Sequence, residues 1–365
     1  MRQDVMSRST CAEDGESAPV ARHADGGEAS GEILLLGVED VRALLEGREA
    51  EVMRAVAAAY VAHQRGQSSL PHSVFLRFAH RPADRVIALP AYLGGEFDAA
   101  GLKWVSSFPG NREAGLERAS AVVILNSART GRPKAILEGS VISARRTAAS
   151  AALAARALHG EGYAGPVGFV GCGPINLEVA RFLLSVYPRL SDFVLFDLHE
   201  DRARRFASLL KGLSAGASAR VAADCEEVLR SSPLVSFATT ASRPHVASLS
   251  ACPAGATVLH VSLRDLSAEA ILAADNVVDD ADHVCRAETS VHLAERLSGS
   301  RDFIRCALAE VLCGEAAPRD PTGSRAPTVF SPFGLGVLDV AVADLVTRLA
   351  RERGVGQVMR GFLPV

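Results

Sequence analysis

A short β-branched run that leads through two glycines into a helix constrains the fold more than any other feature. Residues 167–176 read VGFVGCGPIN. The glycines let the backbone turn tightly and approach a pyrophosphate, whose charge is attracted by the amides and the positive dipole end of the following helix. The segment predicts a dinucleotide site with Gly171, Gly173, Pro174 and Ile175 as candidate contacts. A phosphate-free α/β turn is the alternative.

An acidic residue follows at the distance expected for such a site. The strand predicted over 193–196 ends at Asp197, where dinucleotide sites place a carboxylate on the adenosine ribose hydroxyls. Because an acid repels a 2′-phosphate, Asp197 favours NAD over NADP. Asn176 stands at the usual third glycine position, which leaves the packing of helix on strand unexplained. Three arginines that follow the acid weaken the preference for NAD: Arg202, Arg204 and Arg205.

The second half of the chain alternates strands with helices. Strand-like runs are GPVGFVG, FVLFDL, ARVAA, LVSFATT, TVLHVSL and NVVDD. Such alternation predicts a Rossmann-type, doubly wound parallel sheet. Thr239 and Thr240 end the run LVSFATT, at the crevice where hydroxyls could contact the nicotinamide half of a dinucleotide; turn-forming threonines are the alternative reading.

The first half of the chain has a different pattern of predicted strands. Short strand-like runs punctuated by Gly, Pro and Asn predict a mixed or antiparallel sheet, so the fold class is α/β with a smaller mixed α+β domain. An Ala-rich helix that ends at Gly160 leads into the parallel part. The predicted division is a disordered tail over 1–30, a substrate domain over 31–145 completed by 336–365, and an NAD-binding domain over 146–335.

Composition excludes several classes of protein. The net charge is −3 with 48% hydrophobic residues, which predicts an ordinary globular chain without general affinity for nucleic acid or anionic membrane. No run is long and apolar enough to span a bilayer, and the start has no apolar core typical of a secretion signal. The 7 cysteines are scattered without a CxxC pair, so we expect a reducing cytoplasm, and no cluster has the spacing of a metal site.

Cationic side chains stand inside apolar segments of the first half. Arg77 lies within SVFLRF, Lys103 within GLKWVSS, and Arg146 near the start of the Ala-rich helix. Burying a charge is costly unless it is paired, so these positions predict either structural ion pairs or an anionic ligand. The residues alone leave both possibilities open.

Long motifs resemble those of one known family. They include GLKWVSSFPGN, ARRTAASAALAA, GCGPIN, FDLHED and SLRDLS. The chain from about residue 33 to its end resembles the ornithine cyclodeaminase/μ-crystallin family of NAD(P)-dependent enzymes. Further runs, such as GRPKAILEGSVISARRTAASAALAA and NVVDDADHVCRAETSVHLAE, resemble the branch of N-((2S)-2-amino-2-carboxyethyl)-L-glutamate dehydrogenases, which make 2,3-diaminopropionate for siderophores and peptide antibiotics.

The resemblance implies roles for individual residues. Arg77, Lys103 and Arg146 would bind substrate carboxylates, and Asp265 would be the acid/base, so Asp265 and Lys103 are the candidate catalytic residues. Helix residue Thr147 joins Gly171, Gly173 and Asp197 as a candidate cofactor contact. A structural role for Asp265, as a helix N-cap or partner of Arg264, is the alternative.

The implied reaction is NAD-dependent oxidative hydrolysis to 2-oxoglutarate and L-2,3-diaminopropionate. Cyclodeaminases have Gly-Gly-Asp-Cys-Pro-Gly around their catalytic Asp, whereas this chain has Ser-Leu-Arg-Asp-Leu over 262–266, which disfavours ornithine cyclisation. An ornithine cyclodeaminase, a ketimine or imino-acid reductase, and a non-catalytic crystallin-like binding protein are the alternatives. The resemblance also implies a small amino-acid substrate, a homodimer built through the first domain, and an O-phosphoserine-dependent synthase as pathway neighbour.

Overall fold

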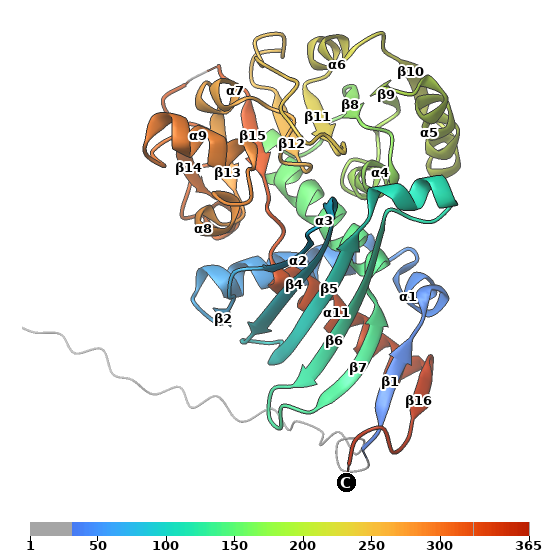
Figure 1. Cartoon of the computed structure of the whole chain (residues 1–365). Coiled ribbons are helices and arrows are strands. Elements are labelled where there is room, and N and C mark those ends of the chain that lie inside the picture. Colours follow the sequence, from blue (N-terminus) through green and yellow to red (C-terminus); the bar gives the residue numbers. More distant parts are fainter. Residues whose placement is uncertain (1–30, 324, 365) are drawn as a thin grey trace, which may run out of the picture.

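The chain folds around two eight-stranded sheets, which lie one above the other in Figure 1. The computed structural model describes residues 31–323 and 325–364. The predicted tail over 1–30 lies outside the described residues. We call the part built on the lower sheet the sheet A lobe and the part built on the upper sheet the sheet B lobe.

Sheet B is wholly parallel, in the order β10-β9-β8-β11-β12-β15-β13-β14. Its strands are β8 (Val167–Val170), β9 (Asp192–Phe196), β10 (Ser218–Val221), β11 (Leu234–Phe237), β12 (Thr257–His260), β13 (Asp275–Val278), β14 (Ile304–Ala307) and β15 (Thr328–Ser331). Its helices are α4 (Pro174–Val186), α5 (Glu200–Leu213), α6 (Cys225–Ser231), α7 (Ala268–Leu272), α8 (Ala281–Val284), α9 (Ser290–Ser298) and α10 (Leu308–Leu312). The predicted Rossmann-type sheet is confirmed. The sequence patterns did not predict β14 and β15, because each has only four residues and pairs with strands remote from it in sequence.

Sheet A is mixed, as predicted, with the order β16-β1-β7-β6-β5-β4-β2 and β3 paired to β4. Its strands are β1 (Ile33–Leu36), β2 (Ser68–Ser69), β3 (Val74–Phe78), β4 (Arg81–Leu93), β5 (Ala99–Ser107), β6 (Ala119–Ser127), β7 (Pro133–Glu138) and β16 (Gln357–Met359). Its helices are α1 (Val38–Leu45), α2 (Glu49–Gln64), the 3₁₀ helix η1 (Pro109–Ala114) and α11 (Gly336–Arg353). The C-terminal segment returns to this lobe, since α11 packs on β4, β5 and β6, and β16 pairs with β1.

Helix α3 (Gly139–Ala154) joins the two lobes. It contacts α2, α11 and β6 of the sheet A lobe as well as α4 of the sheet B lobe. The helix continues as a π-helical turn, Ala155–His159, and stops at Gly160, whose φ is +98°. Gly160 is therefore the helix end that the sequence predicts, while the division at residues 145/146 falls inside α3 and stays a prediction.

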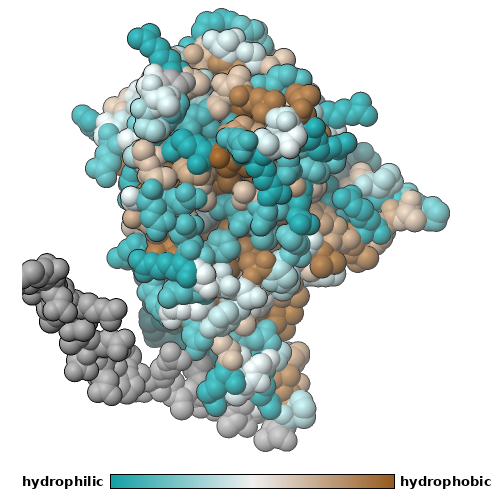
Figure 2. Space-filling view, turned by 90° about the vertical axis from the view of Figure 1, so that its left-hand side faces the viewer, coloured by the Kyte–Doolittle hydropathy of each residue, from teal (hydrophilic) through white to brown (hydrophobic). Residues whose placement is uncertain are grey.

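One face of sheet A is covered by helices and the other is exposed. Helices α2, α3 and α11 lie behind the sheet in Figure 1 and bury one face. The opposite face exposes large apolar side chains, and Val74, Ala88, Trp104 and Val122 follow one another across four strands by register. Figure 2 shows this hydrophobic surface in brown along the right-hand edge of the lower lobe. No helix among the described residues is long and apolar enough to cross a membrane.

Candidate active site

The first glycine of the VGCG turn has a backbone that no other residue could adopt without strain. Gly171 has a φ of +88°, and its N–H donates to Phe196 O at 2.8 Å. A Cβ added there would lie 2.6 Å from Ala238 O. The chain therefore turns between β8 and α4 in direct contact with the end of β11, at the edge where a dinucleotide would lie.

Helix α4 begins without a side-chain cap. Gly173 is its N-cap residue, no side chain bonds to the first turn, and Pro174 takes the first helical position. The amides of the first turn lack intrahelical partners, so they remain available to an anion. Gly173, Pro174 and Ile175 thus form the uncapped start of α4, and their contact with a pyrophosphate stays a prediction.

Asp197 is bound to the same turn. Its Oδ2 accepts the N–H of Cys172 at 2.8 Å and its Oδ1 accepts the N–H of His199 at 3.1 Å. Arg202 Nε lies 3.8 Å from Oδ2, whereas Arg204 pairs with Glu200 on the exposed face of α5. The carboxylate is thus fixed beside the glycine turn, where a ribose would meet it.

Asn176 explains how α4 packs closely without a third glycine. The side chain is fully buried, and its Nδ2 donates to Val170 O at 3.1 Å and Gly171 O at 2.7 Å. Its Oδ1 accepts Ser236 Oγ at 2.7 Å. The amide therefore joins α4 to both β8 and β11, which removes the doubt that the sequence left about this position.

Asp265 is fully buried at the carboxyl edge of sheet B. Thr239 Oγ1 donates to its Oδ1, Ser262 Oγ donates to its Oδ2, and His245 Nε2 lies 3.2 Å from Oδ1. Burial raises the pKa of Asp265, but hydrogen bonds from His245, His260 and Ser262 outweigh burial and hold it well below its usual range. The carboxylate stays ionised at neutral pH.

The alternative roles for Asp265 do not match its contacts. Ser267 caps α7, so Asp265 is no helix cap. Arg264 donates to Ala287 O at 2.6 Å, and burial lowers the pKa of its guanidinium more than the charge of Asp265 raises it. Thr239 lies in the cluster around Asp265, while Thr240 is exposed at the same edge.

A second buried charge cluster lies between sheet A and its helices. Lys103 Nζ lies 2.8 Å from Asp339 Oδ2, and Arg146 Nε donates to Asp339 Oδ1 at 2.9 Å. Ser143 Oγ contacts both cations, at 3.1 Å from Lys103 Nζ and 3.4 Å from an Arg146 nitrogen. Burial, and then the charge of Arg146, lower the pKa of Lys103 to about 8. Thr147 lies beside this cluster and donates to Ser143 O at 2.7 Å.

One loop closes over this cluster. Asp279 accepts the N–H groups of Phe333 at 2.9 Å and Gly334 at 2.7 Å. Gly334 has a φ of +92°, and an added Cβ would lie 2.6 Å from a guanidinium nitrogen of Arg146. A larger residue at 334 would therefore displace the arginine that holds Asp339.

Arg77 does not join Lys103 and Arg146 but belongs to a group further along the same sheet face. It is the register partner of Arg85, and Leu89 of the same strand is the partner of Lys103. Arg85 lies four positions before Leu89 in β4, about 13 Å away at roughly 3.3 Å per residue. Burial and the charges of Arg85 and Arg77 lower the pKa of Arg264, whereas Asp265 and Glu288 raise it, so these charges all lie near Arg264.

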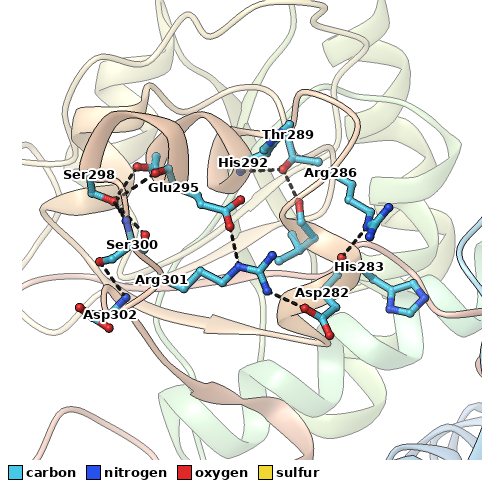
Figure 3. Close-up of polar contacts among 12 residues, drawn as sticks. Asp282, His283, Arg286, Thr289, His292, Glu295, Ser298, Ser300, Arg301 and Asp302 are labelled. Atoms are coloured by element: carbon cyan, nitrogen blue, oxygen red, sulfur yellow. Dashed lines mark hydrogen bonds and ion pairs between the residues drawn. The ribbon is translucent and has the colours of Figure 1, made fainter.

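A cavity of about 480 Å³ opens beside Arg77. It is lined by basic and aromatic side chains, among them His72, Phe75, His283, Arg286 and Phe333. The loop after α8 forms one wall, and Arg301, which follows α9, bridges Asp282 of α8 and Glu295 of α9 beside it (Figure 3). Among the described residues, no group of His, Cys, Asp and Glu could hold a metal ion.

Sequence reasoning missed several residues of this site. One sequence feature could have identified Asp339: it is a charged residue within the apolar run LGVLDVAVADLV of the last helix. His245 and the loop over Arg146 had no such feature, because each lies far in the chain from the residue it contacts. The missed residues are Arg85, His245, His260, Asp279, Gly334 and Asp339.

Comparison with known proteins places this geometry in a family. A model of the ornithine cyclodeaminase/mu-crystallin family matches residues 33–354. An alanine dehydrogenase of Archaeoglobus fulgidus is 32% identical over 91% of this chain and 99% of its own length. An N-((2S)-2-amino-2-carboxyethyl)-L-glutamate dehydrogenase of Staphylococcus aureus is 25% identical over 90% of this chain and 98% of its own length.

Solved structures resemble the whole fold. A Thermococcus litoralis Delta(1)-pyrroline-2-carboxylate reductase in complex with NADH and L-proline superposes with a TM-score of 0.82 at 25% identity, covering 89% of this chain and 99% of that one. An archaeal alanine dehydrogenase dimer with bound NAD superposes with a TM-score of 0.80 at 29% identity, covering 91% and 100% of the two chains. The α/β fold is thus that of dinucleotide-dependent amino-acid enzymes.

Proposed function

Because the chain belongs to the ornithine cyclodeaminase/mu-crystallin family, we propose that it oxidises N-((2S)-2-amino-2-carboxyethyl)-L-glutamate and releases 2-oxoglutarate and L-2,3-diaminopropionate. It is an NAD-dependent oxidoreductase that acts on an amino-acid C–N centre, as its relatives are. The specific substrate is our proposal. It would consume one NAD⁺ and one water per turnover.

The observation that carries the proposal is the surplus of positive charge in the site. Lys103 and Arg146 share one carboxylate, that of Asp339, so one charge of this cluster is uncompensated. The guanidinium groups of Arg77, Arg85 and Arg264 lie near one another, and the charges of Asp265 and Glu288 offset part of their effect on Arg264. Two separate cationic subsites fit a substrate with three carboxylates better than alanine or proline, which have one each.

The residues at the glycine turn fit a dinucleotide. Gly171 and the uncapped start of α4 would hold the pyrophosphate, and Asp197 would accept the ribose hydroxyls. The bound nicotinamide would accept the hydride that leaves the glutamate α-carbon. This assignment favours NAD, because an acidic side chain at position 197 repels a 2′-phosphate.

The side chains then have distinct tasks. Lys103 and Arg146 would hold one substrate carboxylate and so fix the α-carbon against the cofactor. The group around Arg264 would hold the distal carboxylate of the glutamate half. The Asp265 cluster would handle the protons, since water must add to the imine carbon and the amine must leave protonated.

Two related activities are alternatives of the same fold. An alanine dehydrogenase or a pyrroline-2-carboxylate reductase is as similar to this chain as the favoured enzyme. Their substrates would leave the Arg77, Arg85 and Arg264 group without a ligand. Ornithine cyclisation is disfavoured by the sequence around Asp265, and a purely binding role is disfavoured by the buried carboxylate at the nicotinamide edge.

We also propose a homodimer, a cytoplasmic location and a place in a biosynthetic sequence. The exposed apolar face of sheet A offers a surface for a second copy, and a related alanine dehydrogenase is described as a dimer. Six free cysteines in the described chain fit a reducing compartment. An O-phosphoserine-dependent synthase would supply the substrate, and siderophore or peptide antibiotic assembly would consume the diaminopropionate.

The test is nicotinamide reduction by the purified protein with NAD⁺ and the synthetic substrate. We expect NADH, 2-oxoglutarate and diaminopropionate in equal amounts, identified by mass spectrometry. Alanine, ornithine and proline serve as parallel substrates. Turnover of alanine or proline without turnover of the glutamate conjugate would overturn the proposed substrate, and proline formed from ornithine would indicate a cyclodeaminase.

A further inference from the structure

The carboxylate assigned to proton transfer cannot reach a substrate directly. Asp265 is 0% exposed. Its Oδ1 receives bonds from Thr239 and His245, and its Oδ2 receives one from Ser262. Burial raises the pKa of Asp265, but His245, His260 and Ser262 outweigh burial and hold it well below its usual range, so the carboxylate is a weak base at neutral pH. Proton transfer therefore needs another group in contact with it.

Among the partners of Asp265, His245 is the one that reaches the surface. Its side chain is 39% exposed, whereas His260 is fully buried and Thr239 and Ser262 are half-buried. His245 lies in the loop after β11, at the carboxyl edge of sheet B where the nicotinamide is expected. Imidazole is also the side chain that ordinarily exchanges protons between about pH 5 and 8.

The backbone holds this histidine against the carboxylate. The N–H groups of His245 and Val246 both donate to Asp265 O at 2.9 Å, and Val246 forms a β-bridge with Leu266. The 3.2 Å contact between His245 Nε2 and Asp265 Oδ1 is therefore backed by two main-chain bonds. With Nε2–H donated to Asp265, Nδ1 carries the lone pair of the neutral ring.

We propose that His245 exchanges protons with the substrate and the attacking water, and that Asp265 is a positioning residue that orients its imidazole. This inference rests on the proposed function and deepens it. After the hydride has left the α-carbon, His245 takes the N–H proton as the C=N bond forms, and that proton passes to solvent. It then takes a proton from the water whose oxygen bonds to the imine carbon. It returns this proton to the nitrogen, which completes the carbinolamine. It then takes the hydroxyl proton as the C=O bond forms and gives it to the amine nitrogen, which keeps the electron pair of the breaking C–N bond.

The kinetic test compares His245→Ala with Asp265→Asn and with His80→Ala, an exposed histidine in the turn between β3 and β4. We expect His245→Ala to lower kcat by about 100-fold or more, with KM and the NADH dissociation constant within about twofold of wild type. Imidazole added to the buffer should restore part of the rate to this variant and leave His80→Ala unchanged. A rate within about threefold of wild type, or a loss that imidazole does not restore, would overturn the proposal.

A second measurement does not depend on activity. In histidine-labelled protein loaded with NADH, the NMR signal that His245→Ala removes should shift in Asp265→Asn, because the oriented pair is broken. An unshifted signal would overturn the pairing. The kinetic series is run on whichever amino acid the wild type oxidises, so a substrate other than the glutamate conjugate refutes the proposed function and still tests His245.

Discussion

The cofactor end and the substrate end of this molecule recognise anions by opposite means. At the cofactor end, Gly171 and the start of α4 present main-chain amides, which need no counter-charge when the ligand is absent. At the substrate end, Lys103 and Arg146 are buried cations that share Asp339. Recognition by backbone depends on local shape, whereas recognition by buried side chains depends on charges brought together from distant segments.

Removing the shared carboxylate should have the largest effect. Asp339→Asn leaves Lys103 and Arg146 buried without their counter-ion, so we expect the free energy of unfolding to fall by about 3–5 kcal/mol. Urea denaturation measures the loss. Asp344→Asn on the same helix is the matched control: its contact with Lys134 is 3.5 Å long and partly exposed, so it should cost no more than about 1 kcal/mol. Equal losses would show that the buried charges need no shared partner.

The second cationic group, formed by Arg77, Arg85 and Arg264, should distinguish ligands with a second carboxylate from ligands with one. Arg264→Gln should weaken binding of 2-oxoglutarate by about 10- to 100-fold, because one charge-assisted contact to the distal carboxylate is lost. Binding of 2-oxobutyrate, which has no second carboxylate, should not change. Calorimetric titration of the NADH-bound enzyme measures both, with Arg230→Gln on the exposed face of α6 as control. Parallel losses for both ligands would argue against a distal subsite.

The charge of Lys103 makes the substrate end sensitive to pH. Burial lowers the pKa of Lys103 to about 8, so kcat/KM should fall about tenfold per unit above pH 8 as the ammonium loses its proton. Lys103→Arg should keep kcat/KM level to higher pH. The free energy of unfolding should change in the opposite direction and rise with pH. Between pH 8 and 10.5 Lys103 keeps its proton in the unfolded chain but loses it in the folded one, so the cost of burying the ammonium disappears. A wild-type profile that is flat to pH 10 would contradict this.

A methyl group added at the glycine turn should affect the cofactor end alone. Gly171→Ala places a Cβ 2.6 Å from Ala238 O at a φ of +88°, so the NADH dissociation constant should rise about tenfold. Quenching of NADH fluorescence measures it, while 2-oxoglutarate inhibition at saturating NADH should be unaffected. Gly212→Ala is the control: its Cβ meets nothing within 4 Å in α5, and it should leave cofactor affinity as it is.

The same contrast explains how much of the site the sequence could predict. Gly171, Gly173 and Asp197 belong to one strand–turn–helix unit and the strand after it, so local patterns suffice. Lys103 and Arg146 were identified as cations in apolar segments, but their common partner lies in the last helix. Local patterns in a single sequence do not reveal which distant residues meet.

The fold was predictable for a related reason. Alternation of strand and helix identified the parallel sheet as far as β13, and short punctuated strands identified the mixed sheet. The order of sheet B could not be predicted beyond β12, because β15 inserts between β12 and β13 after a long connection. Register also decides that Arg77 and Arg85 share a face with Lys103, and register depends on turns that composition alone does not specify.

Helix α3 limits the modularity of the protein. It is packed by α2, β6 and α11 from one lobe and by α4 from the other, and both Arg145 and Arg146 are buried in it. Arg145 forms ion pairs with both Glu49 of the sheet A lobe and Glu178 of the sheet B lobe. A chimera that exchanged cofactor lobes between relatives at residue 145 would have its junction inside α3. A junction after Gly160, where the π-helical turn that continues α3 ends, would transfer the helix intact.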